Sequence, residues 1–342
     1  MKKYYFTAIL GVLFSSLNPC YGNCYRNNLS ADALVRKHHK SGIIFSGSSH
    51  QCLTREICSF LRTSPGNIDI GRFPDGELRV QIQDDVLGRD VFIVQSFSNR
   101  PDETLFETFV MVDALKRARA KSITVISPYL PYSRQDKLTG TGQPLTAKLV
   151  ANLLACSGVT RLITFDLHAP QIEGFYDVEV IHLHGQKLLG DTFRTISEEK
   201  EFVIVAPDIG ASKLASAAAK MLGVDVVSIS KERVNPTTTK MILQGDVKGK
   251  NILIIDDMSS TGGTLVEAAK LCRDHGARKI SAAVTHGLLT QNAVEKIVAS
   301  GIDYFIMTDT VDLPSHLPNN FIRASIASLI AQELVAITEF CL

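Results

Sequence analysis

The feature that most restricts the fold of this chain is a short segment that occurs twice. Residues 85–94, DVLGRDVFIV, return as residues 246–255, DVKGKNILII, and a second matching pair follows at 120–124 and 277–281. Self-similarity over such a long period indicates two copies of one domain rather than a solenoid of short repeats. A chance likeness between two units of similar local structure is the alternative.

Short apolar runs alternate with amphipathic stretches from about residue 41 onward. The length and β-branched content of the runs favour strands, and the stretches between them fit helices. We expect strands at 43–45, 91–94, 123–126, 162–165, 203–205, 252–255 and 280–284, and helices at 104–117, 147–156 and 213–222. Gly223 follows the last helix in the position of a C-cap. An α/β fold with mainly parallel sheets flanked by helices is therefore predicted.

The composition agrees with two globular domains and excludes several classes of protein. The chain has 342 residues, and a prior of about 150 residues per domain suggests two domains. A formal net charge of +1 provides no broad attraction to nucleic acid or to an anionic membrane. Seven cysteines without a CxxC pair indicate neither a disulfide framework nor a zinc site. An anionic ligand must therefore be held by a local site.

Residues 1–30 form a separate segment. Lys2 and Lys3 precede an apolar run at 6–17, and small residues follow near 20–22, which is the form of a secretory signal. The run is too short to span a bilayer. A mis-assigned start or an uncleaved tail is the alternative, so the prediction is a signal-like or disordered extension.

The most specific motif follows the apolar strand of the second copy. Residues 252–264, ILIIDDMSSTGGT, end a strand in two acids, turn through hydroxyl and glycine residues, and lead into a helix. A helix N-terminus presents unpaired N–H groups and a positive dipole end to a phosphate. Gly262 and Gly263 permit close approach of the backbone, and Thr261 and Thr264 add hydroxyl donors. Helix capping would explain Thr261 alone.

The two acids of this motif indicate which phosphate ligand fits. Asp256 and Asp257 would repel a bare phosphate, but they can bind the paired hydroxyls of a sugar phosphate. No lysine follows the glycines, so the motif is not a Walker loop, and the dinucleotide fingerprint is absent as well. The sequence therefore predicts a sugar phosphate site.

The motif resembles the ribose 5-phosphate loop of the phosphoribosyltransferase fold. Four further segments narrow the resemblance to the ribose-phosphate pyrophosphokinases, which carry that fold twice: RFPDGELRVQI at 72–82, PYSRQDK at 131–137, FDLHAPQIEGFYD at 165–177 and PDIG at 207–210. The resemblance implies two tandem phosphoribosyltransferase-like domains. The first, at 41–185, would be the ATP side, and the second, at 186–342, the ribose 5-phosphate side.

The resemblance also implies a reaction. In that family the β,γ-pyrophosphate of ATP moves to O1 of ribose 5-phosphate, and AMP leaves. Positioning and cationic stabilisation supply most of the catalysis in such transfers. Residues 230–240, SKERVNPTTTK, are similar to the family's mobile catalytic loop, which makes Lys231 and Arg233 the implied catalytic residues. A solvated charge run, with Glu232 pairing locally, is the alternative reading of these residues alone.

Ligand-binding roles follow from the resemblance in the same way. Asp256 and Asp257 would hold the ribose hydroxyls, and the 5-phosphate would be wrapped by Ser260, Thr261, Gly262, Gly263 and Thr264. The implied ATP-binding residues are Arg134, Gln135, His168, Phe73, Asp75 and Glu77. The implied magnesium contacts are His168 and Asp208, and whether Asp166 or Asp177 also touches the metal is left open. Without the family, 73–76 is a plain turn and His168 fits a core histidine better.

The implied partners are ATP, ribose 5-phosphate and further copies of the chain. In the family the segment containing Phe73 covers the adenine of a neighbouring subunit, which implies at least a dimer, with a hexamer as the larger alternative. No nucleic acid or membrane partner is expected. Because both substrates are cytosolic metabolites, the resemblance favours the cytoplasm, whereas residues 1–30 favour export.

Three departures from the family pattern and three rival functions accompany this reading. Ser260 replaces the third acid of bacterial members, as in transferases and archaeal-type members. Residues 138–144 lack the basic residues that flank the family's allosteric phosphate and ADP site, and Ile181 replaces an acid. The rival functions are a phosphoribosyltransferase, a non-catalytic subunit associated with a synthetase, and an exported sugar phosphate-binding protein.

Overall fold

The computed structural model describes residues 42–340, with gaps at 198–200, 236–237, 315 and 339. The signal-like segment predicted at 1–30 lies outside the described residues. Among the helices of the described part, none combines the length and the apolar character needed to cross a membrane.

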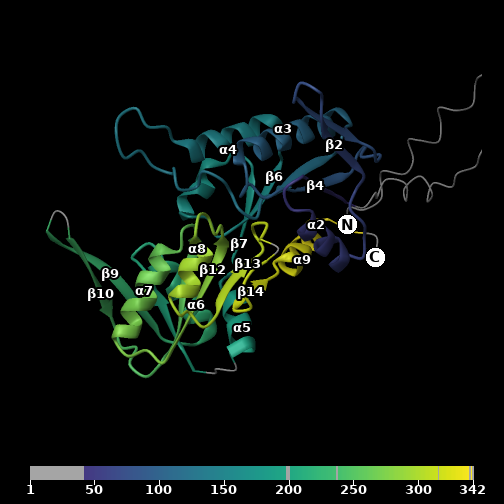
Figure 1. Ribbon diagram of the computed structural model, residues 1–342. Coiled ribbons are helices and arrows are strands. Elements are labelled where there is room, and N and C mark those ends of the chain that lie inside the picture. The colour runs from purple at the N-terminus through teal and green to yellow at the C-terminus, as the bar shows by residue number, and fades with distance from the viewer. Residues whose placement is uncertain (1–41, 198–200, 236–237, 315, 339, 341–342) are drawn as a thin grey trace, which may run out of the picture. The chain divides into compact units, whose positions relative to one another are not determined.

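The first half of the described chain is built on a parallel sheet of five strands (Figure 1). The strands in spatial order are β1 (Ile43–Ser46), β4 (Asp90–Val94), β5 (Ser122–Ile126), β6 (Arg161–Phe165) and β7 (Glu179–Leu183). Helices α3 (Pro101–Arg117) and α4 (Thr146–Ser157) pack on one face. Helix α2 (Gln51–Phe60) packs on the other. Both faces are buried, which explains why these strands are almost continuously apolar.

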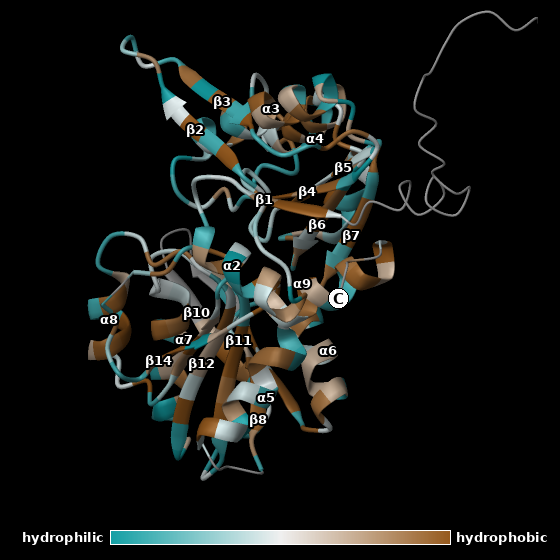
Figure 2. Ribbon diagram, turned by 90° about the vertical axis from the view of Figure 1, so that its right-hand side faces the viewer, coloured by the Kyte–Doolittle hydropathy of each residue, from teal (hydrophilic) through white to brown (hydrophobic). Residues whose placement is uncertain are grey.

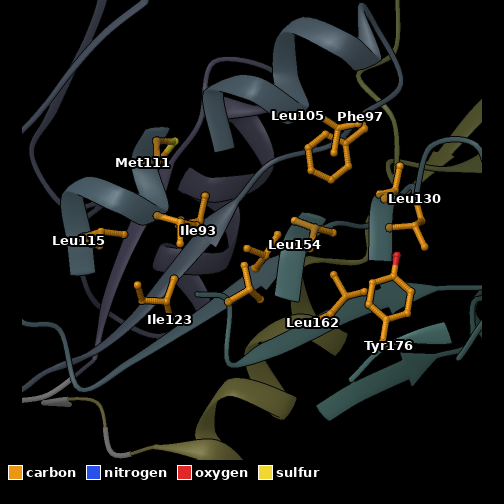
Figure 3. Close-up of a cluster of buried hydrophobic side chains, with 14 of the residues drawn as sticks. Ile93, Phe97, Leu105, Met111, Leu115, Ile123, Leu130, Leu154, Leu162 and Tyr176 are labelled. Carbon is orange, nitrogen blue, oxygen red and sulfur yellow. The ribbon is translucent and has the colours of Figure 1, made fainter. Parts of the chain in front are cut away.

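The core between the first sheet and α3 and α4 is shown in Figure 3. Met111 and Leu115 of α3 and Leu154 of α4 pack with Ile93 and Ile123 of the strands, and all five are at most 2% exposed. A separate antiparallel pair, β2 (Ile68–Arg72) and β3 (Leu78–Ile82), extends from this half. A short 3-10 helix, η1 (Pro170–Phe175), follows β6.

The second half is built on a sheet of seven strands, parallel except for one edge strand. In spatial order they are β10 (Thr238–Gln244), β9 (Val226–Asn235), β8 (Val203–Ala206), β11 (Asn251–Ser259), β12 (Lys279–Gly287), β13 (Phe305–Thr308) and β14 (Phe321–Ala324). Helices α5 (Gln186–Ser197) and α6 (Ser212–Leu222) cover one face. Helices α7 (Gly263–Asp274) and α8 (Ala293–Ala299) cover the other. In Figure 2 the strand β11 has the brown of apolar residues.

The last helix, α9 (Ala327–Ile337), packs on the first sheet although it follows the last strand of the second. Its Ile330 and Leu334 belong to the same buried cluster as Ile57 of α2 and Phe92 of β4. The C-terminal segment therefore completes a core of the first half. The domain boundary near Gly185 stays a prediction.

The two repeated segments form the same local structure. Gly88 donates its N–H to the Arg119 carbonyl over 2.9 Å, and Gly249 donates to the Gly276 carbonyl over 2.7 Å. Both glycines have positive φ, +69° and +67°, a region that a residue with a Cβ adopts at a cost. The matching turns support duplication over chance likeness. The predicted α/β class with mainly parallel sheets flanked by helices is confirmed.

All the strands and helices predicted from sequence are present, with ends that differ by a few residues. Gly223 has φ +66° and caps α6 as expected. The elements that the sequence analysis missed are the helices α2, α5, α8, α9 and η1 and the strands β2, β3, β7, β9, β10, β13 and β14.

Candidate functional site

A cavity of about 1230 Å³ is lined by residues of both halves of the chain. The segments that line it follow β5, β6, β8 and β11 at their carboxyl ends. This is the edge at which open parallel sheets bind ligands, because the loops there are free to carry polar groups. The cavity is therefore the candidate site.

Most of the residues predicted for ligand binding line this cavity. They are Arg134, His168, Asp208, Asp256, Asp257, Ser260, Thr261, Gly262, Gly263 and Thr264. Gln135 is not among the lining residues, and its Oε1 accepts a hydrogen bond from the Thr146 hydroxyl over 2.5 Å. Phe73, Asp75 and Glu77 are not among them either. The cavity thus brings together residues that are far apart in sequence.

The loop after β11 has the strand, turn and helix order expected from its sequence. Gly262 has φ +75° and is the N-cap of α7, which begins at Gly263. A Cβ at Gly262 would lie 3.2 Å from Ile297 Cγ1, so both backbone conformation and packing favour glycine. Thr290 donates its N–H to the Ser260 carbonyl over 2.8 Å and so anchors the loop. The start of α7 therefore faces the cavity with N–H groups suited to an anion.

The acid pair of β11 is joined to the first half of the chain by a histidine. His168 Nδ1 lies 2.8 Å from Asp257 Oδ2. This hydrogen bond raises the pKa of His168. Burial acts to raise the pKa of Asp257, but the hydrogen bond and charge of His168 outweigh it and lower that pKa. An ionised Asp257 beside a protonated His168 is the arrangement that these contacts favour.

The pKa of Asp256 is shifted in the opposite direction from that of Asp257. Burial and the charge of Asp257 raise the pKa of Asp256 to about 8, and Asp208 adds to the effect. Asp208 itself accepts the Ala211 N–H over 3.0 Å, which fixes the loop after β8. The three carboxylates therefore form a concentrated acidic group on the cavity wall, and a cation or sugar hydroxyls there would relieve their repulsion.

Asp166 has a role in the structure that the sequence analysis left open. Its buried carboxylate accepts hydrogen bonds from the Gly185 N–H over 2.9 Å and from the Thr285 hydroxyl over 2.5 Å. The buried His286 donates to the Asp166 carbonyl over 3.1 Å. Thr285 and His286 belong to β12, so Asp166 anchors the end of β6 to the second sheet. In the sequence, the one sign of this anchor is an acid placed directly after the apolar strand β6.

The segment predicted to cover adenine is the tip of the β2–β3 hairpin. Phe73 donates its N–H to the Glu77 carbonyl over 2.8 Å, and Gly76 closes the turn with φ +94°. The Phe73 side chain is 48% exposed. The alternative reading of 73–76 as a plain turn therefore describes the backbone correctly. Contact of this segment with a neighbouring subunit stays a prediction.

The segment predicted to hold the catalytic cations is an antiparallel strand pair. Lys231 pairs with Met241, and Arg233 with Thr239, in the β9–β10 register. Their positions two residues apart on β9 agree with the extended backbone expected. The side chains of Lys231 and Arg233 lie outside the described part, so their predicted role is not tested.

Comparison with known proteins identifies the family. A family described as the N-terminal domain of ribose phosphate pyrophosphokinase matches residues 42–158, and a phosphoribosyl transferase domain matches residues 173–311. A ribose-phosphate pyrophosphokinase of Campylobacter jejuni is 40% identical over 81% of this chain and 89% of its own length. The chain belongs to the ribose-phosphate pyrophosphokinases. The family identity predicted from the motifs is thus confirmed.

Two further relatives agree with this family assignment. The ribose-phosphate pyrophosphokinase of Nitrosomonas europaea is 38% identical over 88% of this chain and 96% of its own length. The crystal structure of phosphoribosylpyrophosphate synthetase from Mycobacterium smegmatis has a TM-score of 0.81 and 36% sequence identity, covering 87% of this chain and 99% of that one. The match extends over both halves, which confirms two phosphoribosyltransferase-type domains in a ribose-phosphate pyrophosphokinase.

Proposed function

We propose that this chain transfers the β,γ-pyrophosphate of ATP to O1 of ribose 5-phosphate, forming 5-phosphoribosyl 1-pyrophosphate and AMP. The observation that carries the proposal is that the loop at 256–264 and the His168 segment line the same cavity and are joined by a hydrogen bond. The loop at 256–264 fits a sugar phosphate. The His168 segment comes from the half of the chain that is expected to bind ATP. The family membership agrees with this reaction.

Ribose 5-phosphate is assigned to the loop between β11 and α7. The 5-phosphate accepts hydrogen bonds from the N–H groups at the start of α7 and from Thr261 and Thr264. Asp256 and Asp257 accept hydrogen bonds from the ribose hydroxyls. Asp256 remains protonated to a higher pH than a free acid, and a protonated carboxyl can donate as well as accept.

ATP is assigned to the part of the cavity lined by Arg134 and His168. The guanidinium of Arg134 suits the phosphates, because it offers several fixed donors. Gln135 is the next residue in the sequence and is proposed to make a neutral polar contact with ATP. Phe73, Asp75 and Glu77 are proposed to reach the adenine of a second copy, since they lie at the tip of the separate β2–β3 pair and Phe73 is half-exposed.

Magnesium is proposed as the metal cofactor, and its binding residues are assigned from the ligand atoms that magnesium prefers. Magnesium prefers oxygen ligands, and Asp208, Asp256 and Asp257 bring carboxylates to one wall. His168 is a less usual ligand, and its Nδ1 is already engaged by Asp257. Asp208 would therefore hold the ion directly and His168 would act beside it. A bound magnesium ion supplies charge neutralisation at the phosphates.

The reaction needs one bond formed and one broken at the β-phosphorus. The O1 hydroxyl of the ribose attacks that atom and releases its proton to water, the bond to the oxygen of the α-phosphate breaks, and AMP leaves with the electron pair. Negative charge grows on the equatorial oxygens of the transferred group. Lys231 and Arg233 are proposed to approach these oxygens from the β9–β10 pair. Arg134 and the start of α7 hold the two substrates in line.

The test is AMP release from ATP and magnesium, with and without ribose 5-phosphate. AMP formed only with the sugar phosphate, together with 5-phosphoribosyl 1-pyrophosphate, supports the proposal. Pyrophosphate released from 5-phosphoribosyl 1-pyrophosphate and a base, without AMP formation from ATP, would identify a phosphoribosyltransferase instead. Binding of ribose 5-phosphate without any turnover would favour a non-catalytic subunit. Since both substrates are cytosolic metabolites, a positive result also favours action in the cytoplasm.

A further inference from the structure

A cluster of nitrogen and oxygen ligands lies on the cavity wall beside the proposed substrate sites. Asp166, His182 and His184 each offer a ligand atom, and these atoms all lie within 4.8 Å of one another. His182 lies on the strand β7, and His184 comes two positions later, directly after the strand ends at Leu183. Their rings have centroids 4.5 Å apart. All three residues line the cavity, which gives an ion a path of entry.

The closest pair in this cluster already has nearly the spacing of two metal ligands. His184 Nδ1 lies 3.0 Å from Asp166 Oδ1. Ligands about 2 Å from a tetrahedral zinc ion are separated by about 3.3 Å. An ion can therefore replace the proton between His184 Nδ1 and Asp166 Oδ1, with a small outward shift of His184, while Oδ1 keeps its second donor, Gln186 Nε2, at 2.6 Å. The His184 side chain is 58% exposed, so it has room to move.

If Nε2 is its ligand atom, His182 gives up one hydrogen bond. His182 Nε2 accepts the Leu167 N–H over 3.0 Å. A bond between imidazole and a transition metal is much stronger than the net contribution of one hydrogen bond to the backbone. Leu167 also lines the cavity, so water can satisfy its N–H after the exchange. Glu173 Oε2, 3.8 Å from His182 Nδ1, adds negative charge on the other side of that ring.

We propose that His182, His184 and Asp166 form a binding site for a divalent transition-metal ion of the zinc type. Two imidazoles and one carboxylate suit zinc, cobalt or nickel, whereas magnesium prefers oxygen ligands only. The proposed magnesium contacts His168 and Asp208 are not among these three ligands, so the two sites differ in their ligand sets. The fourth position of the ion faces the cavity and takes water.

The first experiment is equilibrium dialysis of the full chain against zinc in saturating magnesium. The wild-type protein should bind about one zinc equivalent more than the double variant His182→Asn, His184→Asn. The matched control is His275→Asn, because His275 is an exposed histidine at the end of α7 and outside the cavity. That control should bind as much zinc as the wild type. Equal zinc binding by wild type and double variant would overturn the proposal.

Cobalt absorption gives an independent reading of the ligand set. The wild type should show the intense visible bands of tetrahedral cobalt, and the single variant His184→Asn should lose them. Because His184 is largely exposed, this variant should keep the far-UV circular dichroism of the wild type. Bands that persist in His184→Asn but vanish in His168→Asn would place the ion at the substrate site and contradict the proposal.

Discussion

His168 and Asp257 form an ion pair of 2.8 Å between residues that are 89 positions apart in the sequence. His168 follows the strand β6 of the first sheet, and Asp257 lies on β11 of the second. The pair therefore connects the side proposed to bind ATP with the side proposed to bind ribose 5-phosphate. Its side chains are 39% and 16% exposed, so solvent screens it in part.

Replacing His168 by Asn should damage catalysis much more than stability. A partly exposed ion pair contributes about 1 kcal/mol or less to the free energy of unfolding. The loss of a positioned cation beside transferring phosphates typically lowers kcat/KM by about 10²-fold or more. Steady-state kinetics and urea unfolding of His168→Asn, with His275→Asn as control, measure the two effects. A large fall in stability with unchanged kcat/KM would assign His168 a structural role only.

Gly262→Ala should weaken ribose 5-phosphate binding. The substitution forces a Cβ into positive φ and within 3.2 Å of Ile297 Cγ1, which displaces the start of α7. Gly249→Ala is a matched control, because Gly249 has nearly the same φ, +67°, with nothing within 4 Å of a Cβ. Both variants should lose about 1 kcal/mol of stability from backbone strain.

Only the Gly262 variant should raise the KM for ribose 5-phosphate. Calorimetric binding of ribose 5-phosphate to both variants checks this difference. If Gly249→Ala weakened binding as much as Gly262→Ala, general destabilisation rather than the loop would be the cause.

The sequence was sufficient to predict a strand or a loop where its residues indicate one local conformation. Residues 252–264 predicted strand, turn and helix correctly, because apolar residues, paired glycines and hydroxyls each indicate one conformation. Strand β9 was missed, because its segment 230–235 is rich in charged and polar residues and lies near the sheet edge. Strand β14, Phe321–Ala324, was missed because Arg323 interrupts its short apolar run.

Some features of the site depend on tertiary contacts that no local pattern contains. The Asp166 anchor needs Thr285 and Gly185 beside it, and their proximity follows only from the packing of two sheets. The same holds for α9, whose apolar face predicts burial but does not specify which sheet it covers. The alternative reading of 73–76 as a plain turn describes its backbone, but the proposed partner of this segment is another copy of the chain.

Leu334→Ala should destabilise the first half of the chain although Leu334 belongs to the last helix. Leu334 is 0% exposed and packs in the cluster that contains Ile57 and Phe92. Removing a buried leucine side chain costs about 2–5 kcal/mol. Val335→Ala is the matched control, since Val335 is 57% exposed on the same helix. Amide exchange in β1 and β4 should increase in the first variant, and unchanged exchange there would contradict the packing of α9 on the first sheet.

The contact between Glu56 and Arg323 should make stability depend on acidic pH. Burial acts to raise the pKa of Glu56, but the hydrogen bond and charge of Arg323 lower it below 4.5. The stabilising contribution is therefore present above about pH 4.5 and is lost as the pH falls through the lowered pKa. Because both side chains are more than a third exposed, the contribution is at most about 1 kcal/mol.

Glu56→Gln should therefore lower the free energy of unfolding at pH 7. It should leave that free energy nearly unchanged at a pH low enough to protonate Glu56 in the folded protein. Urea unfolding of both proteins between pH 7 and about pH 2 measures the difference. A constant difference over this range would show that the charge of Glu56 is not responsible.

Lys231→Ala should reduce turnover severely and leave ATP binding nearly unchanged. If Lys231 contacts the transferring pyrophosphate only as charge develops, its loss affects the transition state more than the bound substrate. Loss of a comparable cation in phosphoryl transfer costs about 10³-fold or more in kcat. Single-turnover AMP formation and binding of a non-hydrolysable ATP analogue measure the two quantities, with Lys248→Ala as a control in the turn before β11. Turnover equal to that of the wild type would remove Lys231 from the catalytic role and favour the reading of 230–240 as a solvated charge run.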